Sequence, residues 1–90
     1  MPSATIDPST RGRLSPHTAA LLRQARLARG LSLRAAARLL GVDPGYLSRL
    51  ERGQRRPSID VAHGLIRLLD ADMGLAGDLT AQARHDRPST

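Results

Sequence analysis

The side chains best suited to binding chemistry lie in one short stretch, residues 41–58, which reads GVDPGYLSRLERGQRRPS. This stretch holds Tyr46, the only aromatic residue of the chain. It also holds four arginines, Arg49, Arg52, Arg55 and Arg56. A guanidinium group presents a planar set of donors that suits bidentate contact with a phosphate or a guanine. The stretch therefore indicates recognition of an anion.

Other kinds of site are weakly supported. Because the chain has no cysteine, it has no disulfide, no thiolate nucleophile and no cysteine-based zinc site. His17, His63 and His85 share no spacing typical of metal ligands, and no carboxylate pair stands beside a candidate base. We therefore expect no metal and no cofactor, and an enzyme is the weakest hypothesis.

The distribution of charge agrees with an anionic partner. The formal net charge is +6, and all 14 basic residues are arginine. Residues 11–56 hold eleven arginines and two acids, a balance of +9, whereas residues 57–90 hold three arginines and five aspartates, a balance of −2. Only one half of the chain is suited to meet an anion. The absence of lysine has two open explanations: a need for guanidinium contacts, or a GC-rich genome that encodes arginine heavily.

The composition predicts an all-α fold that positions these side chains. The chain is 90 residues long and 40% apolar, yet phenylalanine and tryptophan are absent, so its core must consist of small aliphatic side chains. Such a core suits closely packed helices, and no alternating run predicts a strand. No apolar run is long enough to cross a bilayer, and the chain does not begin like a secretory signal. We expect a cytoplasmic protein, associated with the nucleoid.

Helix boundaries are marked by capping residues. We expect helices over about 16–28, 33–40, 44–52 and 59–70, and each follows a residue whose side chain can cap it: Ser15, Ser32, Asp43 and Ser58. Glycines at 30, 41 and 53 follow three of these segments and are typical helix terminators. A further short helix is expected near 78–84. The result is a compact bundle of four to five short helices.

Three regions follow from this pattern. Residues 1–13 are rich in Pro, Ser and Thr and are expected to form a flexible arm, either a charged tail or an arm that enters a minor groove. Residues 14–72 form the main helical domain. Residues 73–90 form a C-terminal segment with the short helix and a frayed end.

Two capped short helices joined by a glycine-containing turn, over about residues 32–52, indicate a helix-turn-helix. The segment around them, RLARGLSLRAAARLLGVDPGYLSRLERGQRRPS, resembles the helix-turn-helix of the Cro and phage-repressor type, also called the xenobiotic-response-element family. The resemblance spans about residues 18–71. It implies a lambda-repressor-like bundle in which the helix opened by Pro44 lies in the DNA major groove, while the amino end of the preceding helix meets the phosphate backbone.

The resemblance also implies which residues read bases. The base-reading positions of the family fall on Pro44, Gly45, Ser48 and Arg49. Pro44 has no donor and Gly45 has only its backbone, so direct contacts depend on Ser48, Arg49 and Tyr46. For Tyr46 two compatible interpretations stay open: its ring packs at the edge of the core, or its hydroxyl contacts a phosphate or base.

Phosphate contacts are expected from two places. Leu33 stands where the family often has a glutamine that touches phosphate, which leaves that contact to Ser32 and Arg34 at the start of the same helix. The other candidates are the polar residues beyond the recognition helix: Arg52, Gln54, Arg55 and Arg56. Their alternative role is that of ordinary solvated charges. The family also places an ion pair on Arg26 and Glu51, and we expect it to be structural.

The function implied is that of a sequence-specific DNA-binding transcriptional regulator, most simply a repressor that occupies an operator. One short recognition helix reads few base pairs, so we expect a homodimer on two-fold symmetric double-stranded DNA. The apolar residues beyond the motif are the candidates for its surface: Leu68, Met73, Leu75 and Leu79.

Two alternatives stay open. One is an antitoxin that represses its own operon and binds a toxin partner. The other is a protein-interaction module that binds a sigma factor or another regulator. Pro44 and Gly45 favour this second alternative, because they remove side chains where base readers are expected.

Overall fold

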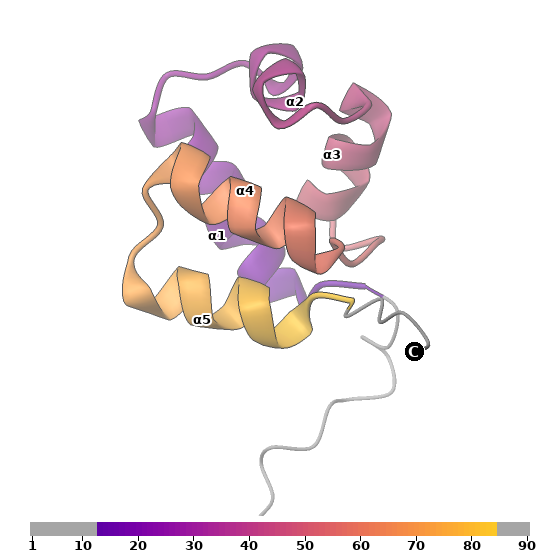
Figure 1. Cartoon of the computed structure of the whole chain (residues 1–90), viewed down its shortest axis with the longest axis vertical. Coiled ribbons are helices and arrows are strands. Elements are labelled where there is room, and N and C mark those ends of the chain that lie inside the picture. Colours follow the sequence, from indigo (N-terminus) through magenta and orange to yellow (C-terminus); the bar gives the residue numbers. More distant parts are fainter. Residues whose placement is uncertain (1–12, 85–90) are drawn as a thin grey trace, which may run out of the picture.

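Each helix in the described part of the chain, residues 13–84, begins at a side chain that caps its first turn. In this computed structural model the helices are α1 (Pro16–Ala28), α2 (Leu33–Leu40), α3 (Pro44–Glu51), α4 (Ile59–Leu69) and α5 (Met73–Gln82) (Figure 1). Each cap side chain accepts a hydrogen bond from a backbone N–H group of the first turn. The five caps are Ser15, Ser32, Asp43, Ser58 and Asp72. Capping of this kind satisfies donors that a helix leaves unpaired at its amino end. The all-α fold and the four predicted caps are confirmed.

The last helix corrects the sequence-based expectation. A short helix was expected near 78–84, but α5 begins at Met73 and ends at Gln82. The Asp72 carboxylate accepts the Leu75 N–H at 2.8 Å and so starts the helix early. Gly74 and Gly77 weaken the helical signal of this segment, because glycine has a low intrinsic helix propensity. Packing of Leu75 and Leu79 on the core outweighs that preference.

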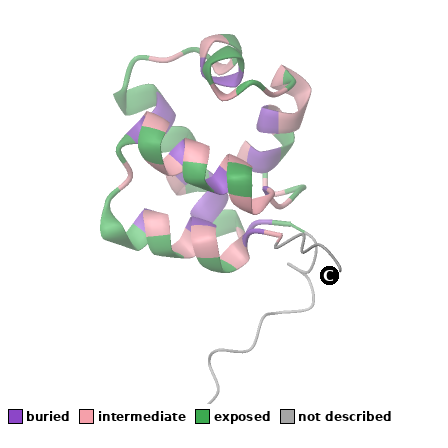
Figure 2. Cartoon of the chain, in the orientation of Figure 1, coloured by how far each residue is buried: buried purple, intermediate pink, exposed green. Residues whose placement is uncertain are grey.

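The core is formed by leucine and alanine side chains from all five helices. Figure 2 shows the buried residues on the inward sides of the ribbons. The largest fully buried side chains come from α1, α3, α4 and α5 and from the residue before the α1 cap. They include Leu14, Leu22, Leu47, Leu50, Leu65 and Leu79. Helix α5 packs on α1 and α4, and α3 packs on α1 and α2. Figure 1 shows α2 and α3 at one end of the molecule and α5 at the other.

Residues far apart in the sequence meet at the loop between α3 and α4. The Leu14 N–H donates to the Arg55 carbonyl at 2.9 Å, and the Arg84 N–H donates to the Pro57 carbonyl at 2.7 Å. The Ile59 N–H then donates to the Arg84 carbonyl at 3.0 Å. The segments before α1 and after α5 therefore hold this loop from two sides.

The packing also corrects the expected dimer surface. Leu75 and Leu79 lie in the core of their own chain and so do not offer an exposed surface. Leu68 is half-buried against that core. Of the four candidates only Met73 is freely accessible, with 91% of its surface exposed.

Because Leu79 has none of its surface exposed, we predict that Leu79→Ala lowers the free energy of unfolding by about 3 kcal/mol. Urea denaturation followed by circular dichroism measures this change. The matched control on the same helix is Met73→Ala, which removes an exposed side chain. It should change the free energy of unfolding of the single chain by less than about 0.5 kcal/mol. Equal stability of Leu79→Ala and the parent would contradict a structural role for α5.

Candidate nucleic-acid interface

Helix α3 is held against the bundle by one side and leaves the other accessible. Leu47 and Leu50 are buried in the core, whereas Arg49 is exposed and Ser48 is half-buried. Pro44 occupies the first turn, where its missing N–H costs nothing. This eight-residue helix is too short to be stable alone, so its position depends on these two leucines and on its neighbours.

A buried ion pair fixes the far end of α3. Arg26 Nε lies 2.7 Å from Glu51 Oε2, and Arg26 Nη2 lies 2.9 Å from Glu51 Oε1. Arg26 Nη1 also donates to the Leu31 carbonyl at 2.8 Å. The two side chains are 9% and 5% exposed, and the hydrogen bonds that Arg26 donates to the Glu51 carboxylate raise the pKa of Arg26 above its ordinary value. The ion pair implied by the family resemblance is present, and it joins α1, the turn after α1 and α3.

The first turn of α3 has few free donors. The Gly45 N–H donates to Asp43 Oδ2 at 2.8 Å, and the Tyr46 N–H donates to the same oxygen at 3.3 Å. The backbone donor expected to make Gly45 a base contact is therefore already occupied. An aspartate two residues before a glycine was the signal in the sequence that could have predicted this, since a capping carboxylate takes the N–H groups of the first turn.

Gly45 instead leaves space for the Asp43 cap, and the Arg49 guanidinium lies next to it. A Cβ atom at Gly45 would lie 2.8 Å from Asp43 Oδ2 and 3.8 Å from Arg49 Nη1. The Arg49 guanidinium therefore reaches back one turn toward the amino end of α3, as long helical side chains commonly do. The structure brings Gly45 and Arg49 together at the end of α3 that begins with Pro44.

Tyr46 contacts an arginine that the sequence did not connect with it. The guanidinium carbon of Arg55 lies 5.7 Å from the centre of the Tyr46 ring, within the range of a cation–π contact. The Arg55 backbone is fixed as well, because its carbonyl accepts the Leu14 N–H. Tyr46 is half-buried and Arg55 is exposed. The ring therefore supports a cation whose remaining surface faces solvent.

The other candidates in and beyond α3 differ in their surroundings. Arg52 is exposed, and its Nε donates weakly to the Ser48 carbonyl at 3.4 Å. Gln54 is exposed, and its N–H donates to the Arg49 carbonyl at 2.8 Å. Arg56 is half-buried, and its Nε is buried without a hydrogen-bond partner among the described residues. Arg52 and Gln54 thus present their side chains to solvent, while Arg56 presents only part of its own.

At the start of α2, Ser32 and Arg34 are both exposed. Ser32 Oγ accepts the Ala35 N–H at 3.0 Å, which leaves the hydroxyl hydrogen free to donate elsewhere. Leu33, which stands where the family often has a glutamine, packs against the core. A helix amino end beside a hydroxyl and a guanidinium is a favourable place for a phosphate.

Neither a metal site nor a membrane-spanning helix is evident within residues 13–84. No three His, Cys, Asp or Glu side chains gather there as they would around a metal ion. His17 and His63 are exposed, and His85 lies outside the described residues. None of the described helices has the length and apolar character needed to cross a membrane.

Comparison with known proteins identifies relatives of this arrangement. A family model for a helix-turn-helix domain matches residues 17–82. The restriction-modification controller protein C.AhdI from Aeromonas hydrophila is 34% identical, with a TM-score of 0.61 over 71% of this chain and 92% of that chain. The clp gene regulator ClgR from C. glutamicum is 30% identical, with a TM-score of 0.62 over 77% of this chain and 90% of that chain. Curated protein sequences yielded no match.

We predict that Glu51→Gln lowers the free energy of unfolding by about 3 kcal/mol, because it leaves the Arg26 charge buried without its counter-charge. Chemical denaturation of Glu51→Gln, Arg26→Gln and the double variant measures the coupling. The double variant should lose at least about 1 kcal/mol less than the sum of the single variants.

The matched control for this ion pair is Arg23→Gln, which removes an exposed arginine from the same helix. It should leave stability within about 0.5 kcal/mol of the parent. Strict additivity of the Arg26 and Glu51 substitutions would contradict a structural role for the pair.

Proposed function

The chain belongs to the helix-turn-helix domain family, as its sequence predicted, and we propose that it binds double-stranded DNA as a sequence-specific transcriptional regulator. One observation carries this proposal: α3 is fixed from behind by Leu47, Leu50 and the Glu51 ion pair, while Ser48 and Arg49 face outward. A rigid helix with exposed polar side chains fits the major groove, where each base pair presents a distinct pattern of donors and acceptors.

Base selectivity is assigned mainly to Arg49. Its guanidinium reaches toward the amino end of α3, the end that enters the groove in related domains. Arginine pairs with the O6 and N7 atoms of guanine in a bidentate way. Ser48 adds a hydroxyl one residue away. Gly45 has no side chain, so DNA can approach the helix closely there. Its own N–H donates to Asp43 and is not free for a base.

Affinity without sequence preference is assigned to the remaining arginines and to α2. The exposed guanidinium groups of Arg34, Arg52 and Arg55 are available for phosphate contacts. Arg56 is half-buried and presents only part of its side chain for a further contact. Ser32 supplies its hydroxyl at the amino end of α2. Each phosphate contact releases condensed counterions, so binding must weaken as salt rises.

The regulatory role is proposed from the two structural relatives, which are named as a restriction-modification controller and a clp gene regulator. A repressor that blocks polymerase by occupying its operator is the simplest form of that role. One helix of eight residues spans few base pairs, so we propose a homodimer that binds a two-fold symmetric site.

One observation favours the rival hypothesis of a protein-interaction module. Pro44 has no N–H, and Asp43 occupies the N–H groups of Gly45 and Tyr46, so the first turn of α3 offers DNA few free donors. Under this hypothesis the partner is a sigma factor or another regulator. Substitution of Arg49 and Arg55 by alanine would then leave partner binding intact.

We predict that selection from random duplex DNA enriches an inverted repeat, and that affinity for this site falls by about a thousandfold between 50 and 200 mM salt. In the same selection Arg49→Ala should lose base preference at one position per half-site, at a cost of about 1–3 kcal/mol. The matched control is Arg67→Ala, which removes an exposed arginine at the end of α4 and should leave base preference unchanged. Absence of any enriched sequence would refute the proposal.

We also predict that the ring of Tyr46, and not its hydroxyl, supports DNA binding by positioning Arg55. Tyr46→Phe should keep the affinity within about twofold, whereas Tyr46→Leu should weaken it about two- to fivefold, which is the expected strength of an exposed cation–π contact. Fluorescence anisotropy with the selected site measures both. In the Tyr46→Leu background Arg55→Ala should have a smaller effect than in the parent. Equal losses for the Phe and Leu variants would instead assign the contact to the hydroxyl.

A further inference from the structure

The side chain of Gln82, at the end of α5, joins that helix to the beginning of α1. Gln82 Oε1 accepts the Ser15 N–H at 2.9 Å, and Gln82 Nε2 donates to Thr18 Oγ1 at 2.9 Å. Ser15 Oγ donates to the same Thr18 oxygen at 2.9 Å and accepts the Thr18 N–H at 3.2 Å. Thr18 has only 1% of its surface exposed. Ser15, Thr18 and Gln82 therefore form a hydrogen-bonded group with a buried centre, which we call the Gln82 cluster.

The Gln82 cluster adjoins both segments that hold the loop between α3 and α4. On one side, Leu14 lies directly before the cluster, and its N–H donates to the Arg55 carbonyl at 2.9 Å. On the other side, Arg84 lies just beyond the cluster, and its N–H donates to the Pro57 carbonyl at 2.7 Å. A change in the position of α5 against α1 is therefore transmitted to the backbone of this loop from two directions.

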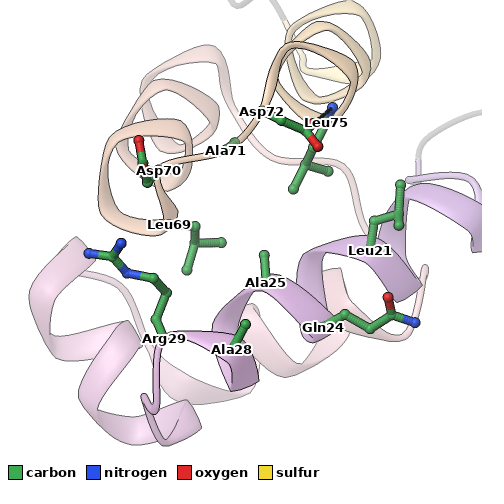
Figure 3. A pocket seen from close by; sticks show the side chains of 10 residues that line it. All are labelled: Leu21, Gln24, Ala25, Ala28, Arg29, Leu69, Asp70, Ala71, Asp72 and Leu75. Carbon is green, nitrogen blue, oxygen red and sulfur yellow. Dashed lines mark hydrogen bonds between the residues drawn. The ribbon is translucent and has the colours of Figure 1, made fainter.

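The packing of α5 on α1 is uneven along its length. Near the amino end of α5, a pocket of about 380 Å³ lies between the second half of α1 and the turn that leads into α5. Figure 3 shows Leu75 on one side of this pocket and Leu21 and Ala25 on the other. At the carboxyl end of α5, Leu79 and Ala83 are buried. The Gln82 cluster thus lies at the end where α5 is fixed more closely.

A buried group of this kind contributes more to orientation than to stability. Replacing both partners of a hydrogen bond by apolar groups of the same shape can leave stability nearly unchanged. A fully satisfied network nevertheless specifies one arrangement of the elements that it joins. The Gln82 amide offers one donor to Thr18 and one acceptor to Ser15, so few placements of α5 on α1 satisfy both. Leucine and alanine side chains impose no such directional requirement.

We propose that Gln82 is a positioning residue for DNA binding, which acts with Ser15 and Thr18 to set the loop that places Arg55 against a phosphate. The inference rests on the proposed function, which assigns Arg55 to a phosphate contact. Helix α3 is held separately by its buried leucines and by the Glu51 ion pair. Loss of the Gln82 cluster therefore displaces the phosphate-contacting loop and leaves the base-reading helix in place.

The first test is the double variant Thr18→Val with Gln82→Met, which replaces the polar atoms by apolar groups of similar size. Since Ser15 is only half-buried, water can accept its N–H, and the melting temperature should stay within about 5 °C of the parent. Affinity should fall about fivefold for the selected site and for unrelated duplex DNA alike. The slope of log affinity against log salt should decrease by about one, because one phosphate contact is lost. Base preference should not change.

The matched control is Thr80→Val on the same helix. Thr80 Oγ1 donates to the Ala76 carbonyl of its own helix at 2.8 Å and makes no contact with α1 through this bond. The control should keep the affinity and the salt slope of the parent. A second variant, Gln82→Ala, removes a half-buried side chain at the helix end and leaves the Ser15 to Thr18 hydrogen bond intact. It should show the same loss of salt slope and carries the test if the double variant is unfolded.

A measurement without DNA keeps failure of this inference apart from failure of the proposed function. Amide hydrogen exchange at Leu14 and Arg84 should be at least about tenfold faster in Gln82→Ala than in the parent, because local opening of the loop becomes more favourable. Exchange at Leu47, whose N–H donates to the Asp43 carbonyl in α3, should not change.

Three results would overturn the inference. The first is a pair of folded variants that keep the salt slope of the parent. The second is loss of base preference together with affinity, which would show that the cluster acts on α3. The third is a parent that selects no DNA, which also refutes the proposed function, and faster exchange at Leu14 and Arg84 would then identify the cluster as a purely structural link.

Discussion

The arrangement of this domain depends on one buried guanidinium. Arg26 donates to both carboxylate oxygens of Glu51 and to the Leu31 carbonyl, and so it joins α1, the turn after α1 and the end of α3. A core without phenylalanine or tryptophan has few large contacts with which to orient an eight-residue helix. Directional hydrogen bonds to a charged group supply the orientation that small aliphatic side chains do not. The orientation of α3 in the bundle is therefore tied to a residue on α1.

A second constraint acts on the loop that follows α3. Its backbone is held by the segment before α1 through Leu14 and by the segment after α5 through Arg84. These contacts matter because the loop carries Arg55 and Arg56 within a region of large positive charge, where mutual repulsion opposes a compact state. Backbone N–H and C=O groups carry no net charge, so their hydrogen bonds hold the loop whatever the repulsion between arginine side chains. The loop can thus present guanidinium groups to an anion without an acidic partner of its own.

The two ends of the molecule differ in charge. Helices α2 and α3 with the loop after them carry five exposed arginines, Arg34, Arg38, Arg49, Arg52 and Arg55. The pocket between α1, α4 and α5 is lined by Asp70 and Asp72 as well as by Arg29. The division follows the charge of the chain, which is strongly positive before residue 57 and slightly negative after it.

The local features of the fold were determined by the sequence alone. Helix starts at Ser15, Ser32, Asp43 and Ser58 were predicted because a cap acts on the N–H groups of its own first turn, a few residues away. The Arg26 and Glu51 pair was predicted only through the family resemblance. The start of α5 was missed, because Gly74 and Gly77 argue against a helix that packing of Leu75 and Leu79 nevertheless stabilises.

Only the tertiary structure decided the features that join distant segments. The cation–π contact of Tyr46 with Arg55, the buried Nε of Arg56 and the pocket between α1 and the turn before α5 each depend on how separate elements pack. Periodicity and capping carry no information about such contacts, because they describe the relation of a residue to its own helix. Which apolar side chains remain exposed, Met73 rather than Leu75 or Leu79, follows from the angle at which α5 lies on α1 and α4.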